Sequence, residues 1–329
     1  MESITKNRQG PDVLRAMVER AYGAGQVPAG DGWAEELGHG WFNVAYQIRL
    51  RDGTRVVLKI APPAGVEVMT YERDMMRIEV RALAMIREQT VVPVPAVHHF
   101  DQSRELCDAD YFFMEFVDGE NLGIIREDLP PEQFRAYDEA LGAANHALNQ
   151  IKGEGFGSLL GVQPGATWRQ VFTGIVEDVL RDGERRQVDI GWDYDLIREV
   201  LAQHAGSLDE VTEPAFIEWD LWESNVMVRD GALLSIIDHE RALFGDYLME
   251  AGFVAVELEG MGERPGFLHG YGKETLTPTE SVRRRLYNLH LALIMVIETV
   301  YRGHTDPAQQ YDWAKTKLDD VMETLGRHR

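Results

Sequence analysis

The sequence predicts an α+β protein of two lobes: a small antiparallel β lobe with one major helix, followed by a large, mainly helical lobe. Three observations support this prediction. Residues 32–118 consist mostly of apolar segments typical of strands, with a single helical pattern among them. Asp-Gly pairs at 52–53 and 230–231 each separate two apolar runs, which is a strong hairpin signal. From residue 120 onward, helical periodicity dominates.

The first lobe opens with a short amphipathic helix at 11–22, where Pro11 and Asp12 are typical of a helix start. Two predicted strands, VAYQIRL and TRVVLKIA, follow on either side of the first Asp-Gly pair. A helical pattern covers residues 67–88, and the apolar segments VPVPAVHHF and YFFMEFVDG complete the lobe.

Helical patterns in the second lobe cover residues 131–151, 168–181, 193–206, 280–301 and 307–325. The one strand-rich stretch expected in this half is 216–246. We therefore divide the chain into residues 1–118, which include the leading helix, and residues 119–329.

Composition restricts the function classes. The formal net charge is −22, and nucleic acid binding depends on Lys and Arg neutralising phosphates, so no nucleic acid partner is expected. No run of about 18 apolar residues is present, so no membrane span is expected. The N-terminal ten residues lack an apolar signal core, and Cys107 is the one cysteine, so we expect a cytoplasmic protein.

The negative charge is unevenly distributed. Residues 1–118 carry 13 Lys/Arg and 18 Asp/Glu, whereas the remainder carries 20 and 37. An acidic second lobe could attract a cationic small molecule, but a solvated acidic surface that serves solubility has the same composition.

The stretch 216–246 carries the chemistry. Asp220 is followed five residues later by Asn225, and the second Asp-Gly hairpin would return the chain to Asp238 beside them. A base-like carboxylate next to an Asn/Asp pair suited to hard cations is what phosphoryl transfer from Mg-ATP requires.

Upstream motifs occur in a consistent order. Gly38, Gly40 and Asn43 form a Gly-rich stretch before a predicted strand, where backbone N–H groups can approach phosphates. Lys59 ends the second strand of the first hairpin, and Glu79 lies on the predicted helix that follows.

With these motifs, over about residues 30–260, the chain resembles the aminoglycoside phosphotransferase / choline kinase-like family of small-molecule kinases. The resemblance implies a bilobal protein-kinase-like fold. It implies that residues 1–118 form the nucleotide-binding lobe and that residues 119–329 hold the catalytic loop, the metal loop and the acceptor site. It also implies ATP as the donor, with GTP as an alternative, and Mg²⁺.

The resemblance assigns roles to the motif residues. Asp220 would be the catalytic residue, and Asn225 and Asp238 the metal ligands. Lys59 would contact the phosphates with Glu79 as its ion-pair partner, Glu72 being the alternative partner. The remaining nucleotide contacts would come from the Gly-rich stretch and from the linker after the last strand of the first lobe, namely Gly38, Gly40, Asn43, Glu115 and Val117.

One position departs from the family. The family motif His-x-Asp has Glu218 in place of His. We expect Glu218 to orient the catalytic loop by binding backbone N–H groups or a cation such as Arg241. Trp222, Tyr247 and Glu250 follow the catalytic and metal motifs, and we consider them as acceptor contacts.

The expected function is ATP-dependent transfer of the γ-phosphate to a hydroxyl of a small molecule, with an amine-bearing sugar, an aminoglycoside-like antibiotic or a related metabolite as the acceptor. Two alternatives stay open: a kinase acting on a protein hydroxyl, and a nucleotide-binding regulatory pseudo-kinase with little turnover, which the Glu218 departure motivates.

Overall fold

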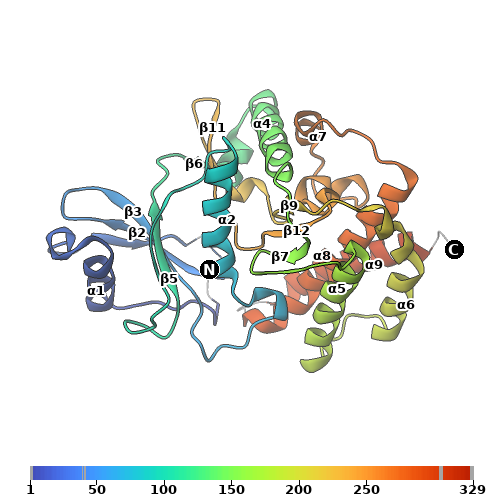
Figure 1. Ribbon diagram of the computed structural model, residues 1–329, viewed down its shortest axis with the longest axis horizontal. Coiled ribbons are helices and arrows are strands. Elements are labelled where there is room, and N and C mark those ends of the chain that lie inside the picture. The colour runs from blue at the N-terminus through green and yellow to red at the C-terminus, as the bar shows by residue number, and fades with distance from the viewer. Residues whose placement is uncertain (1–2, 39, 41, 304–306, 327–329) are drawn as a thin grey trace.

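The computed structural model describes residues 3–38, 40, 42–303 and 307–326, in which a five-stranded antiparallel sheet precedes a mainly helical region (Figure 1). The sheet confirms the predicted β lobe. Its strands are, in spatial order, β1 (Ala34–Glu36), β2 (Val44–Arg49), β3 (Arg55–Ile60), β5 (Tyr111–Glu115) and β4 (Val97–Asp101).

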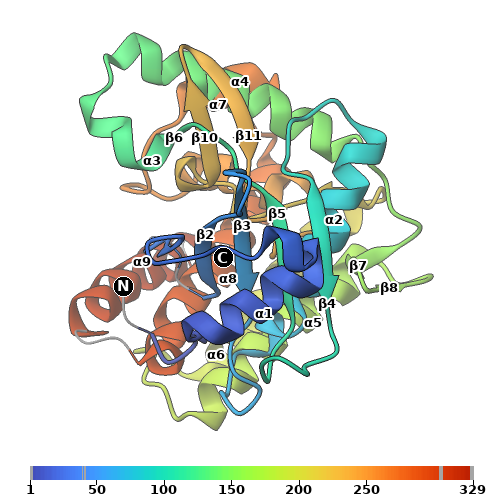
Figure 2. The ribbon, with the colours of Figure 1, turned by 90° about the vertical axis from the view of Figure 1, so that its left-hand side faces the viewer.

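Side-chain alternation along β3 gives the sheet two apolar faces. Val56 and Leu58 pack in one cluster with α1 (Pro11–Tyr22), which lies across the sheet in Figure 2. Val57 belongs to the second cluster, which includes α2 (Met75–Gln89) on the opposite face. Lys59 follows Val57 in the alternation, so its side chain points to the α2 side of the sheet.

Both Asp-Gly pairs form the predicted hairpins. The first joins β2 to β3, with Gly53 at φ 91°. The second joins β10 (Val226–Arg229) to β11 (Ala232–Ile236), with Asp230 at φ 50° and Gly231 at φ 83°. Positive φ at both central residues is the conformation that an Asp-Gly hairpin turn favours. The second hairpin pairs Val226 with Ile236 and so returns the chain to the start of β10.

Among the described residues, the second lobe contains the five predicted helices and two short ones that the sequence did not indicate, α3 (Leu122–Ile125) and α7 (Pro265–Tyr271). The predicted five are α4 (Pro131–Asn149), α5 (Trp168–Arg185), α6 (Tyr194–His204), α8 (Pro278–Arg302) and α9 (Pro307–Gly326). Helix α8 is buried along most of its length. Its start is fixed by a capping box between Thr277 and Glu280, with Pro278 at the first turn.

The prediction of one helix over 67–88 was wrong in its first part. The α-helix begins at Met75, after Asp74 in a left-handed conformation (φ 60°), and Thr70–Glu72 form a 3-10 turn. Tertiary contacts hold this turn: the Thr70 backbone N–H donates to Asp182 of α5 at 2.5 Å, and Glu72 forms an ion pair with Arg302 of α8. The turn therefore connects the β lobe to two helices of the second lobe.

The second lobe also holds more strands than predicted. The β10–β11 hairpin is extended by a third strand, β6 (Glu120–Asn121). A separate four-stranded sheet has the order β8 (Gly161–Gln163), β7 (Phe156–Ser158), β12 (Leu243–Gly245) and β9 (Ala215–Ile217). Each of these four strands has three residues, which is too short for a period-2 pattern to appear in the sequence. Within the described ranges, no helix is long and apolar enough to cross a membrane.

Candidate active site

The Lys59 ammonium links the two lobes. Its Nζ lies 2.6 Å from Glu79 Oε1 of α2 and 2.8 Å from Asp238 Oδ1, in the loop that follows β11. Burial lowers the pKa of Lys59, but the carboxylates of Asp238 and Glu79 outweigh burial and raise the pKa above its ordinary value. Lys59 is therefore a fixed cation. Glu79 is its partner in the structure, whereas the alternative partner, Glu72, binds Arg302.

Asp238 stands in a left-handed conformation (φ 69°), which costs free energy for any residue other than glycine. Burial raises the pKa of its carboxyl, but the Lys59 ammonium outweighs burial and the pKa is lowered. The neighbouring Ile237 N–H donates to the Asn225 carbonyl at 2.9 Å, so the hairpin brings Asn225 and the Asp238 loop together, as the spacing predicts.

Three side chains from the surrounding loops bind Asp220. Its Oδ1 accepts from the Trp222 indole at 2.9 Å, and its Oδ2 lies 3.3 Å from Arg241 Nε. Its carbonyl accepts from the Asn225 amide nitrogen at 2.9 Å, which leaves the amide oxygen of Asn225 for a cation. Burial raises the pKa of Asp220 despite the nearby Arg241 guanidinium. Arg241 is itself stacked on Tyr71 and Trp219.

Glu218 has a different partner from the one expected. It forms a hydrogen-bonded ion pair with His239 Nδ1, and both side chains are buried. Arg241 binds Asp220 instead. The prediction that Glu218 ties the catalytic loop to the segment around Asp238 agrees with this geometry, although the cation is His239. Burial lowers the pKa of His239, but the Glu218 carboxylate outweighs burial and raises it.

Three carboxylates form a cluster suited to a hard cation. Glu79, Asp238 and Glu240 each offer an oxygen, and these oxygens lie within 4.8 Å of one another. Glu79 Oε2 is buried without a hydrogen-bond partner among the described residues, so it is open to a further ligand. Oxygen donors of this kind fit Mg²⁺. Sequence reasoning missed Glu240, although its position two residues after Asp238 was a usable signal.

The Gly-rich stretch reaches this cluster through Asn43. Asn43 Nδ2 donates to Glu240 Oε2 at 2.6 Å. Burial and the nearby Asp238 raise the pKa of Glu240 well above its usual range. Gly40 lies close to Asn43, since a Cβ at position 40 would be 3.4 Å from the Asn43 carbonyl oxygen. Asn43 therefore contributes its side chain as well as its backbone to the site.

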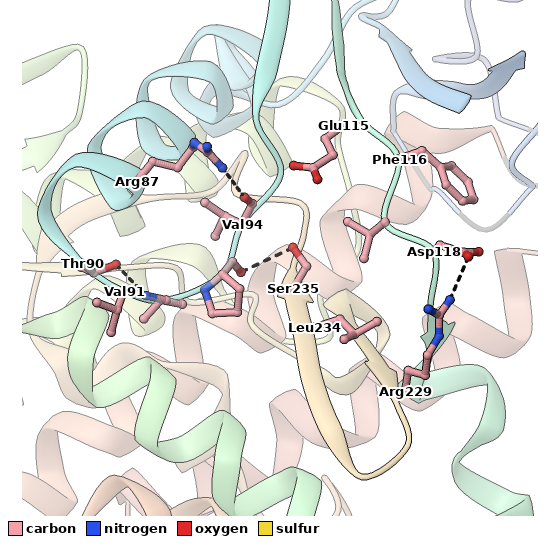
Figure 3. Close-up of a pocket in the computed structure, with 13 residues that line it drawn as sticks. Arg87, Thr90, Val91, Val94, Glu115, Phe116, Asp118, Arg229, Leu234 and Ser235 are labelled. Carbon is pink, nitrogen blue, oxygen red and sulfur yellow. Dashed lines mark hydrogen bonds and ion pairs between the residues drawn. The ribbon is translucent and has the colours of Figure 1, made fainter. Parts of the chain in front are cut away.

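The predicted linker contacts, Glu115 and Val117, lie beside a cavity of about 630 Å³ (Figure 3). The cavity is also lined by the segment after α2, including Val94, and by Ser235 of β11. Neither Lys59 nor the catalytic loop lines it. The residues that line this cavity therefore differ from those of the cluster around Asp238.

The three candidate acceptor residues have different surroundings. Trp222 contacts Asp220 directly. Tyr247 is half-buried and donates to Glu280 at 3.1 Å. Glu250 is fully buried, where it accepts from Asn149 at 2.8 Å and from the Glu218 N–H at 3.2 Å. The structure therefore places Trp222 beside Asp220, and it places Glu250 in contact with the backbone of the segment that precedes Asp220.

The family model of the phosphotransferase enzyme family matches residues 33–286. No curated protein sequence gave a match. Among solved structures, a candidate fructosamine-3-kinase from Thermobifida fusca YX-ER1 is 22% identical with a TM-score of 0.66, covering 94% of this chain and 98% of that one. Aminoglycoside phosphotransferase APH(4)-Ia, in a ternary complex with AMP-PNP and hygromycin B, is 17% identical over the same shares with a TM-score of 0.66.

A third similar structure is the GDP complex of aminoglycoside 2'-phosphotransferase-IIIa, at 16% identity and a TM-score of 0.65, covering 98% of this chain and all of that one. At these identities the likeness establishes a shared fold, and that fold is kinase-like.

Proposed function

The chain belongs to the phosphotransferase enzyme family, and we propose that it transfers the γ-phosphate of ATP to a hydroxyl group of an amine-bearing small molecule. The family and the kinase-like fold make it a small-molecule kinase that binds a nucleotide. The identity of donor and acceptor and the roles of single residues are our proposal. The observation that carries it is the convergence of Lys59, Glu79 and Asp238 within hydrogen-bond distance, next to the loop that holds Asp220.

The donor side follows from this cluster. Lys59, held by Glu79, would bind phosphate oxygens, and the backbone of Gly38 and Gly40 would approach the phosphates. Asp238 and the free amide oxygen of Asn225 would hold Mg²⁺, with Glu240 as an additional oxygen donor. When bound, Mg²⁺ neutralises charge on the phosphates. The linker at Glu115 and Val117 would contact the purine.

The acceptor side depends on Asp220. Its carboxylate, oriented by Trp222 and Arg241, would bind the acceptor hydroxyl and accept its proton. Because phosphoryl transfer passes through a loose transition state, positioning and charge contribute more than strong base catalysis. Tyr247, which follows the Asp238 loop in the chain, would be a further acceptor contact.

The division of the chain is part of the proposal. Residues 1–118 would form the nucleotide-binding lobe, and residues 119–329 would provide the catalytic loop, the metal loop and the acceptor site. The acidic balance of the second part favours a cationic acceptor. A cytoplasmic setting, where Mg-ATP is available, belongs to the same proposal.

The test is an ADP- or GDP-release assay with Mg²⁺ and ATP or GTP, over a panel of aminoglycosides, amino sugars, neutral sugars and a generic protein acceptor. We expect release above background with an amine-bearing compound, and its loss in Asp238→Ala. Nucleotide binding without turnover on any acceptor would favour the regulatory pseudo-kinase, and turnover on the protein acceptor alone would favour a protein kinase.

A further inference from the structure

The N-terminal segment Ser3–Gln9 runs between the two lobes. At its start, the Ile4 N–H and the Ser3 hydroxyl donate to the Arg302 carbonyl at the end of α8, at 3.3 and 3.2 Å. At its end, Asn7 Nδ2 donates to the Ala61 carbonyl at 3.2 Å, and the Gln9 N–H donates to the Tyr46 hydroxyl. The segment is therefore anchored at both ends.

Lys6, in the middle of this segment, points to the Gly-rich stretch. Its Nζ donates to the Asn43 carbonyl at 2.5 Å, and a Cβ on Gly40 would lie 3.4 Å from the same nitrogen. The Asn43 side chain binds Glu240 of the acidic cluster at 2.6 Å. Asn43 thus connects the Lys6 ammonium to the loop that carries Asp238.

The electrostatic surroundings of Lys6 include two carboxylates of the same site. Burial lowers the pKa of Lys6, and the charged groups that act on it are Glu36, Arg8, Glu240 and Asp238. The ammonium is half-buried. Within the described part of the chain, it donates one hydrogen bond of the three that an ammonium can form. Donors remain for an anionic ligand.

We propose that Lys6 is a second phosphate-binding lysine, whose ammonium contacts phosphate oxygens of the nucleotide bound beneath Gly40 and Asn43. The inference rests on the proposed function, because it requires a nucleoside triphosphate at this place. A lysine ammonium binds phosphate as a compact point charge, and a half-buried position strengthens that attraction. Lys59 approaches the phosphates from the sheet, and Lys6 approaches them from the N-terminal segment. Sequence position gives no hint of this pairing, since residue 6 precedes every recognisable motif.

The experiment compares the affinities of a non-hydrolysable ATP analogue with Mg²⁺ and of adenosine, measured by calorimetry on the full chain. In Lys6→Met the affinity for the analogue should fall about tenfold to a hundredfold, the usual scale for a hydrogen bond to a charged group. The affinity for adenosine, which carries no phosphate, should change by less than about twofold. Lys6→Arg should retain most of the affinity for the analogue.

Arg8→Met is the matched control, because it removes a cation of the same segment that forms an ion pair with Glu36 at 2.7 Å. It should leave both affinities within about twofold of the wild type. Lys6→Gln separates the two roles that Lys6 could have, since glutamine can still donate to the Asn43 carbonyl but carries no charge. Under the proposal, Lys6→Gln loses affinity for the analogue as Lys6→Met does.

Four results would overturn the proposal. Wild-type affinity of Lys6→Gln would mean that Lys6 only positions the Gly-rich stretch. Equal losses for the analogue and adenosine in folded Lys6→Met would mean that the segment acts on the whole cleft. If the wild-type chain bound no ATP or GTP analogue, the proposed function would fail as well, whereas intact wild-type binding with an unaffected Lys6→Met variant would remove the Lys6 inference alone.

Discussion

The buried pair of Glu218 and His239 makes the stability of this protein depend on pH, and Glu218→Gln should remove that dependence. His239 Nε2 lies 3.1 Å from the Ile236 carbonyl, which can only accept a hydrogen bond, so Nε2 carries a proton. Nδ1 faces the Glu218 carboxylate, which also accepts. Because the Glu218 carboxylate raises the pKa of His239 despite burial, we expect the second proton on Nδ1, so that His239 is an imidazolium paired with a carboxylate.

The direction in which stability changes with pH follows from the linkage between protonation and folding. The pKa of His239 is raised above the usual value of about 6.5, because the Glu218 carboxylate outweighs the effect of burial. The pair thus contributes its full stability below about pH 6.5, and the contribution is lost as the pH rises through the folded-state pKa. Each unit of difference between folded and unfolded pKa corresponds to about 1.4 kcal/mol.

The residue that replaces Glu218 determines how much of the folding stability is lost. Glu218→Ala leaves the buried histidine without its partner, which typically costs about 3–5 kcal/mol, a large share of a stability of about 5–15 kcal/mol. Glu218→Gln keeps the shape, and its amide can donate to Nδ1 of a neutral histidine. That neutral hydrogen bond contributes about 1 kcal/mol and does not require the second proton.

The assay is chemical denaturation from pH 5.5 to 8.5 of the wild type, Glu218→Gln and Glu199→Gln, an exposed glutamate on α6 that serves as the control. The stability difference between the wild type and Glu218→Gln should shrink as the pH rises, whereas that of the control should stay flat. A constant difference across this range would refute the charged pair. Glu218→Gln should also keep most of the activity. Abolished turnover with intact folding and nucleotide affinity would instead make Glu218 a catalytic carboxylate.

Three further predictions concern other parts of the chain. Asp220→Ala should lower kcat by roughly 10²–10⁴-fold with nucleotide affinity retained, and a native rate on the true acceptor would contradict its role. Burial and Glu218 raise the pKa of Glu250 to about 7 from 4.5, so its contribution to stability falls between pH 4.5 and 7. Glu250→Gln should remove about 3 kcal/mol of this pH dependence, which denaturation across that range would detect. Gly142→Ala places a Cβ 2.1 Å from the Phe267 carbonyl of α7 and should lower the melting temperature, whereas Gly174→Ala, in open space on α5, should raise it slightly.

The predictable part of the site consists of residues in local patterns with a fixed order. The two Asp-Gly turns require positive φ, and this local requirement located both hairpins. Once the second hairpin is placed, Asn225 and the Asp238 loop must meet. Glu79 could be predicted because it lies on the helix that follows β3, in the order that the family resemblance implies, and this helix packs on the face of the sheet to which Lys59 points. The fold followed from periodicity over long segments, which depends on no single contact.

The unpredicted part consists of contacts between distant residues. Ser3 and Arg302 are 299 positions apart, and no sequence pattern near either residue predicts their hydrogen bond. The predicted helix over 67–88 is too long for the same reason, because contacts of Thr70 with α5 and of Glu72 with α8 stabilise a 3-10 turn there. A cation as the partner of Glu218 was predicted with Arg241 as the example, but the structure has His239 in this place. Arg241 and His239 are two positions apart, and only the packing of the loop determines which of them reaches the carboxylate.

The charge of the acceptor side shows where composition alone misleads. The second lobe has a large acidic surplus, yet Asp220 itself is paired with an arginine. Arg241 lies 3.3 Å from Asp220, and Arg302 binds both Glu72 and Glu298 at the end of α8. An ammonium group of the acceptor would therefore meet no unpaired carboxylate at Asp220 itself. Its attraction would come from the summed field of the lobe, which raises the encounter rate and is weakened by salt.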